Sequence, residues 1–244
     1  MTDVATVTGQ GRLPTDLAGE LMDVLADEPS IVLCDLQGMA AGASVSEVFA
    51  PVGPYLAHWP GTVVVVHVDD PRMRDGLFAA EGSDRLLVDE SVESGLDHAL
   101  ERVPPVQHAA VQLSPLLTAS RDARRFVTRT LLDWQLPRLV APASLVVSEL
   151  VTNSIVHAVT VIELTLSVAD DKLRIAVHDH GGGSPRAPGG EAAEHLLGGR
   201  GLMVVQAFTC CWGVFPSRGR GKTVWAVTDQ GRPAQGQRSR ATSS

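Results

Sequence analysis

Three polar side chains recur at helical spacing in an otherwise apolar stretch of the second half of the chain. Glu149, Asn153 and His157 stand four residues apart, so on a helix they would share one face. A carboxylate can act as a general base, and an amide oxygen is a ligand that suits Mg²⁺. Such a helix could activate a nucleophile beside a metal ion. The alternative is a solvated polar face, and this helix alone does not decide between the two.

A second group of residues follows the apolar run Leu173–Val177, which is typical of a buried strand. Asp179 stands where this strand would end, with Gly181 and Gly183 close behind it. A carboxylate there could accept a hydrogen bond from an exocyclic amine, and the glycines would let the backbone approach a flat ligand closely. The alternative is an ordinary glycine-rich turn.

A third group, Gly199, Arg200, Gly201 and Leu202, leads into a helix that we expect over Leu202–Phe208. The free N–H groups at the start of a helix attract anions, and the helix dipole adds to that attraction. Arg200 contributes a planar cation that suits phosphate. The alternative is a helix with a flexible entry.

The fourth group lies between Gly221 and Trp225. Thr223 is expected to begin a strand and to place its hydroxyl next to Asp179. Lys222 is one of only two lysines in the chain, the other being Lys172. Taken alone, this segment could be no more than a basic hairpin turn.

The elements that must position these groups can be predicted from the periodicity of the apolar residues. The helices expected in the second half are Ser120–Trp134, Ala143–Ala158 and Leu202–Phe208. The expected strands are Ala109–Leu113, Val161–Val168, Lys172–His178, Cys211–Phe215 and Thr223–Val227.

The first half alternates between strand and helix patterns, which favours an open sheet covered by helices. Strands are expected at Ile31–Cys34, Thr62–Val66 and Leu86–Val88, and helices at Leu17–Leu25, Val45–Ala50 and Ser91–Arg102, the last with Ser91 as its N-cap. Pro104 and Pro105 cannot continue a helix, so they mark a boundary. We predict domains over residues 1–104 and 105–229 and a disordered tail over 230–244.

Charge divides the chain at the same boundary. The 244 residues carry a net charge of −8, with −13 in residues 1–104 and +5 in residues 105–244. An acidic half is a poor nucleic-acid binder, whereas the basic half suits an anionic small ligand or an acidic protein partner. Three cysteines do not predict a disulfide framework. The sequence shows no signal peptide and no apolar run long enough to span a membrane, so we expect a cytoplasmic protein that binds neither a membrane nor nucleic acid.

The order and spacing of the four groups resemble a known family. The segments Glu149–Ala158, Asp179–Gly181, Gly199–Leu202 and Gly221–Trp225 resemble the ATP-binding domain of the GHKL superfamily, which includes gyrases, heat-shock chaperones, histidine kinases and mismatch-repair ATPases. The similarity covers residues 105–229 and is strongest to the anti-sigma-factor serine kinases. It implies an α/β fold (an α+β sandwich) of the Bergerat ATP-binding type, with ATP and Mg²⁺ as cofactors.

The resemblance also implies a role for each matching residue. Glu149 would be the general base and Asn153 the ligand of Mg²⁺. Asp179 would bind the adenine amine in a pocket shaped by Gly181, Gly183 and Thr223. The phosphates would be held by Gly199, Arg200, Gly201 and Leu202. His157 matches the motif, but we expect it to pack against the hairpin rather than to act in catalysis.

The first half resembles, in degenerate form, a STAS domain, the fold of the anti-anti-sigma factors that such kinases phosphorylate. The resemblance is carried by Asp35-Leu36-Gln37-Gly38 after a predicted buried strand, followed by Ser44 and a helix. Ser44 falls where the family has its phosphorylated serine, but Ala43 replaces the acidic residue before it. We therefore interpret Ser44 as a helix N-cap. We expect the domain to have a docking or regulatory role.

Three hypotheses for function follow. The first is a serine/threonine protein kinase that phosphorylates a STAS partner in a sigma-factor pathway. Relatives of this kind often form homodimers, and the sequence leaves the oligomeric state open. The second is a nucleotide-gated binding module with little catalysis, in which the acidic half docks on the basic half and holds the ATP site closed. A fragment of a histidine kinase is disfavoured, because no helical hairpin with an acceptor histidine precedes residue 105.

Overall fold

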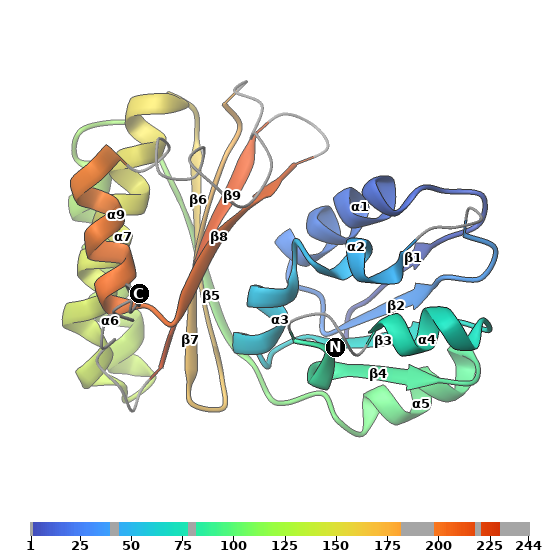
Figure 1. Ribbon diagram of the computed structural model, residues 1–244. Coiled ribbons are helices and arrows are strands. Elements are labelled where there is room, and N and C mark those ends of the chain that lie inside the picture. Colours follow the sequence, from blue (N-terminus) through green and yellow to red (C-terminus); the bar gives the residue numbers. More distant parts are fainter. Residues whose placement is uncertain (1, 40–43, 78–81, 182–197, 218–220, 230–244) are drawn as a thin grey trace, which may run out of the picture.

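The computed structural model describes residues 2–39, 44–77, 82–181, 198–217 and 221–229. Two sheets organise this part of the chain, and the chain passes from one to the other at Pro104 and Pro105 (Figure 1). The α/β fold class expected from the sequence is confirmed.

The first sheet has four parallel strands in the order β1-β2-β3-β4. Its strands are β1 (Val4–Thr8), β2 (Ile31–Asp35), β3 (Val63–His67) and β4 (Leu86–Asp89). The two central strands are almost entirely buried, as expected of a parallel sheet with helices on both faces. The sequence did not predict β1, because it is an edge strand with only Val7 buried.

Six helical segments accompany this sheet. They are α1 (Pro14–Ala26), α2 (Val45–Phe49), α3 (Gly53–His58), α4 (Pro71–Leu77), the 3₁₀ segment η1 (Ser83–Arg85) and α5 (Val92–Leu100). The predicted N-cap of α5 is confirmed, since the Ser91 side chain accepts a hydrogen bond from the Ser94 amide at 3.1 Å. Ser44 also stands at an N-cap position, but its Oγ contacts the Ser46 Oγ at 2.7 Å instead of a backbone N–H. The predicted N-cap position of Ser44 is therefore confirmed, but its side chain makes no capping hydrogen bond.

The second sheet has five strands in the order β5-β6-β7-β9-β8, all antiparallel. Its strands are β5 (Gln107–Leu113), β6 (Ile162–Ala169), β7 (Lys172–Asp179), β8 (Cys211–Pro216) and β9 (Lys222–Asp229). One face is covered by α6 (Ala119–Asp133), α7 (Pro137–His157) and α9 (Gly198–Phe208), on the left of Figure 1. All five strands and all three helices expected in this half are present.

Helix α7 begins six residues before the predicted start at Ala143. Pro137 opens it, at a position where a missing N–H costs no hydrogen bond. Pro142 lies inside the helix and so does not end it, which is why the prediction was too short.

Helix α7 is also long and apolar enough to cross a membrane, with a mean hydropathy of 1.6. Its buried side chains, however, pack in one hydrophobic cluster with α6, α9 and the second sheet. Its apolar character is that of a core helix, and length and composition alone are weak grounds for a membrane span.

The other face of the second sheet packs against the first half of the chain. In Figure 1, α1 and α3 lie between the two sheets, and one hydrophobic cluster runs from Val64 of β3 to Val227 of β9. Tyr55 of α3 sits at its centre, with ring centroids 5.2 Å from Phe215 and 4.9 Å from Trp225, both in edge-on orientation. Such aromatic contacts are specific as well as apolar, so the two halves share a packed core.

A buried ion pair crosses this interface. Arg174 of β7 contacts the Glu28 carboxylate at 2.7 Å, and their side chains are only 1% and 8% exposed. Glu28 follows α1 with a φ of 57°, in the left-handed region, and also accepts a hydrogen bond from Ser167 at 2.7 Å. The acidic half and the basic half are therefore joined by a specific charged contact as well as by apolar packing.

Candidate functional site

Asn153 is the most unusual polar residue of α7. Its side chain is 6% exposed, and both its amide oxygen and its amide nitrogen are buried without a hydrogen-bond partner among the described residues. An unpaired buried amide costs roughly 1–3 kcal/mol, so a protein rarely keeps one without a use. The orphaned oxygen fits a ligand for a hard metal ion, as the sequence led us to expect.

Glu149 lies one turn before Asn153 and is partly exposed. A Cβ added to Gly201 of α9 would lie 2.7 Å from the Glu149 Oε2 atom. The first turn of α9 therefore touches the carboxylate, and only a glycine fits there without displacing it. The candidate base, the candidate metal ligand and an anion-attracting helix start meet in one place.

Helix α9 begins at Gly198, so Gly199, Arg200 and Gly201 lie inside its first turn rather than ahead of it. The first N–H groups of a helix have no partner within the helix, so this turn could bind phosphate. The side chains of Arg200 and Leu202 lie outside what the structure describes, as does Gly183. Their predicted roles remain predictions.

Asp179 ends β7 and is completely buried. Its Oδ2 accepts from the Ser154 hydroxyl at 3.0 Å, and its Oδ1 accepts from the Gly181 amide at 3.2 Å. A Cβ on Gly181 would lie 2.6 Å from the Ala158 Cβ, so Gly181 permits a close approach to the end of α7, and its predicted approach to a ligand remains a prediction. Through Ser154, which follows Asn153 in the sequence, Asp179 is hydrogen-bonded to α7.

Thr223 does not lie beside Asp179, and this prediction is wrong. Asp179 pairs with Lys222 across the β7–β9 ladder, and Thr223 pairs with His178. Successive side chains of a strand point to opposite faces, so Thr223 is turned away and contacts the His178 Nδ1 at 3.0 Å. Lys222 takes the expected place, with its Nζ 2.9 Å and 3.2 Å from the two Asp179 oxygens.

His157 lies in the last turn of α7 and is exposed, so the expected packing against the hairpin is also wrong. On the opposite face of the sheet, burial, followed by the nearby His180, lowers the pKa of the His178 imidazole. Neither histidine contributes to the group around Asn153.

The described residues contain no cluster of three or more His, Cys, Asp or Glu side chains that could hold a metal ion. A metal at this site would need Asn153 together with oxygens from a ligand or from water. That donor set is typical of Mg²⁺, which keeps waters and binds through one or two protein groups plus phosphates. The residues present therefore fit Mg²⁺ bound together with a nucleotide.

One comparison with known proteins bears on this arrangement. Residues 113–228 match the family model of the histidine kinase-like ATPase domain. No curated protein matches the chain. The matched segment, just under half of the chain, contains every candidate residue of the site and supports a GHKL-type ATP-binding domain here.

The docked first half does not close this site. Residues of α1 and α3 cover the face of the second sheet that is opposite to α7 and α9 (Figure 1). The two halves are in contact, as one hypothesis required, but the idea that this contact blocks access to the ATP site is wrong. The STAS-like character of the first half remains a prediction.

Proposed function

We propose that the protein is an ATP-dependent serine/threonine kinase of the anti-sigma-factor type, which transfers the γ-phosphate of ATP to a serine of a STAS-domain partner. The observation that carries the proposal is the buried, unpartnered amide of Asn153, one turn from the Glu149 carboxylate that touches Gly201. In phosphoryl transfer the protein mainly positions the reacting groups and neutralises the charge on the phosphates. A base, a metal ligand and an anion-binding turn meet those needs.

Each residue has a defined task in this proposal. The Glu149 carboxylate accepts the proton of the substrate hydroxyl, and its partial exposure leaves room for that substrate. Asn153 Oδ1 holds the Mg²⁺, which when bound neutralises charge on the phosphates. Asp179 accepts from the amine of the base, and the first turn of α9 binds phosphate oxygens.

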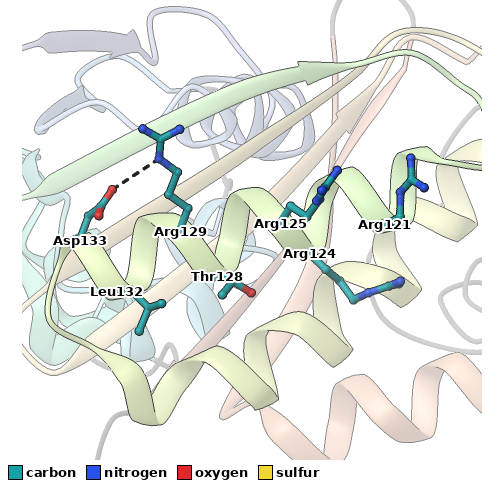
Figure 2. A pocket seen from close by; sticks show the side chains of 7 residues that line it. All are labelled: Arg121, Arg124, Arg125, Thr128, Arg129, Leu132 and Asp133. Atoms are coloured by element: carbon teal, nitrogen blue, oxygen red, sulfur yellow. Dashed lines mark ion pairs between the residues drawn. The ribbon is translucent and has the colours of Figure 1, made fainter.

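A basic surface beside this site supports an acidic protein partner. Figure 2 shows Arg121, Arg125 and Arg129 on one side of α6 and Arg124 on another, and all four line a shallow groove. The side chain of Arg124 donates to Ser148 at 3.1 Å, and Ser148 directly precedes Glu149 in α7. An acidic surface docked on these arginines would bring a substrate serine towards Glu149.

The test is phosphoryl transfer from labelled ATP to a panel of STAS-domain proteins. We expect transfer to a serine by the wild type and a loss of about 10²-fold or more in Glu149→Ala, because general base catalysis contributes that much. Glu47→Ala, an exposed carboxylate of α2, is the matched control and should transfer label normally. Undiminished transfer by Glu149→Ala would refute the assigned base.

The second candidate is a nucleotide-gated binding module with weak catalysis. It is favoured by the buried contact between the two halves through Arg174 and Glu28. This contact holds the first half against the ATP-binding domain, where it could bind a signalling partner. Tight ATP binding without transfer, together with ATP-dependent capture of a STAS protein, would favour this candidate over the kinase.

A further inference from the structure

Lys222 and Asp179 form a buried ion pair at the edge of the proposed nucleotide site. Their side chains are 6% and 0% exposed, and the ammonium contacts both carboxylate oxygens. Removing two charges from water is costly, so a pair of this kind needs a compensating use. The chain has only one other lysine, Lys172, which pairs with Asp229 at the opposite end of β7.

Asp179 and Lys222 differ in how many of their hydrogen-bonding positions are occupied. Each oxygen of Asp179 already accepts two donors, one from Lys222 and one from either Ser154 or Gly181. An ammonium has three N–H groups. Within the described part of the chain two of them are directed at Asp179, which leaves the third for a ligand.

An adenine ring presents an amine donor next to a ring-nitrogen acceptor, N1. A carboxylate beside an ammonium offers the complementary order of acceptor and donor. Lys222 also holds the charge of Asp179 in place in a site from which water is excluded. The pair can therefore recognise two adjacent atoms of the base, where Asp179 alone could recognise one.

We propose that Lys222 is a specificity-determining residue for the base: its third N–H donates to N1 of adenine, and the neighbouring amine takes the place of one of the four donors from which Asp179 now accepts. This inference rests on the proposed binding of ATP. It assigns to Lys222 a role that the sequence analysis had given to Thr223. A hypoxanthine ring carries a keto oxygen and an N–H at the same two positions, so it would set an N–H against the ammonium.

The first test compares three triphosphates by calorimetry: ATP, purine riboside triphosphate, which lacks the amine but keeps N1, and ITP. The wild type should bind them in that order of decreasing affinity. Lys222→Met should weaken ATP binding at least about tenfold and should reduce the preference for purine riboside triphosphate over ITP. Lys172→Met is the matched control and should leave all three affinities unchanged.

The second test needs no variant of the pair. The wild type labelled with ¹⁵N at lysine Nζ has two labelled sites, and Lys172→Met identifies the Lys222 signal. Saturating ATP should shift the Lys222 signal and leave the Lys172 signal in place. If Lys222→Met fails to fold, this spectrum decides the question by itself.

Several results would overturn the inference. One is an unchanged ATP affinity in folded Lys222→Met. Another is a Lys222 signal that does not move at saturating ATP. A third is tighter ATP binding by Lys222→Met, which would mean that the lysine competes with the base for Asp179. All three presuppose that ATP binds. If no adenine nucleotide binds the wild type, it is the proposed function that fails first, and the two failures are distinguishable.

Discussion

The two lysines of the chain form ion pairs of different kinds at opposite ends of the second sheet. At one end Asn153, Asp179 and Lys222 are all at least nine-tenths buried, and Asp179 of β7 is bonded to Lys222 of β9 and to Ser154 of α7. Their burial makes each hydrogen bond strong and each unpaired atom expensive. At the other end Lys172 and Asp229 are partly exposed and form an ordinary surface pair. The proposed site residues lie at the first end.

A pH effect is expected from Asp89, at the end of β4. Its carboxylate contacts His98 Nδ1 at 2.6 Å, and hydrogen bonding to His98 and Ser94 lowers the pKa of Asp89 to about 2. A lowered pKa stabilises the fold above the ordinary carboxyl pKa of about 4, and that stabilisation is lost as the pH falls towards 2.

Asp89→Asn should therefore be less stable than the wild type at pH 5, and the difference should shrink between about pH 4 and pH 2. Urea unfolding followed at pH 5, 4 and 3 measures it. A difference that stays constant or grows on acidification would contradict the expectation. Asp84→Asn, at an exposed position in η1, serves as the comparison.

At the scale of the elements, Gly201 brings helix α9 so close to Glu149 that a side chain would fit there only if the carboxylate moved. Gly201→Ala would place a methyl group 2.7 Å from the Glu149 Oε2, so the carboxylate or the helix must move. We expect the transfer rate to fall by at least about tenfold while the fold is retained, since a shift of about 1 Å at a catalytic group is costly.

Gly19→Ala is the matched control, because Gly19 lies within α1 and an added Cβ there meets nothing within 4 Å. It should leave activity unchanged and stabilise α1 by about 0.5–1 kcal/mol, since alanine favours a helix over glycine. Thermal unfolding and transfer assays on both variants give the comparison. Full activity in Gly201→Ala would contradict the assigned position of the carboxylate.

Most strands and helices of the second half could be predicted, because their apolar residues recur with the period of the element. The strand register could not. Thr223 and Lys222 are neighbours, and a shift of one residue turns every side chain of a strand to the other face. Sequence could not tell which of them faces Asp179. The spacing did correctly place Glu149 and Asn153 one turn apart on a helix and Asp179 at the end of a strand, because the period of each element fixes those positions.

At the scale of the whole molecule, the two halves are one packed body rather than two tethered domains. The sequence indicated a boundary at Pro104 and Pro105 and opposite charges on either side of it. It could not indicate that α1 and α3 cover the second sheet, because Arg174 alternates with apolar residues as an exposed arginine would. That arginine is instead 1% exposed and paired with Glu28.

Removing one partner of this pair should be costly. Glu28→Gln keeps the shape of the side chain but leaves the Arg174 charge buried without compensation, so we expect a loss of about 3–5 kcal/mol in the free energy of unfolding. The double variant Glu28→Gln/Arg174→Met should lose less than the single one, because no charge is then stranded.

Asp133→Asn is the control for that experiment. Asp133 pairs with Arg129 at 3.9 Å on the surface of α6, with both side chains at least 70% exposed, and its loss should cost less than about 1 kcal/mol. Denaturant unfolding of the three variants should also show a single transition, since one hydrophobic cluster spans both halves. Two separate transitions in the wild type would contradict the shared core.

The most direct measurement is isothermal titration of the folded protein with ATP in the presence of Mg²⁺. We expect saturable binding at one site per chain, and its loss or severe weakening in Asn153→Ala, on α7, and in Asp179→Asn, at the end of β7. Binding should persist in Lys172→Met, at the far end of the same strand. The absence of any heat with the folded wild type, or equal binding by all variants, would contradict a nucleotide site at this place.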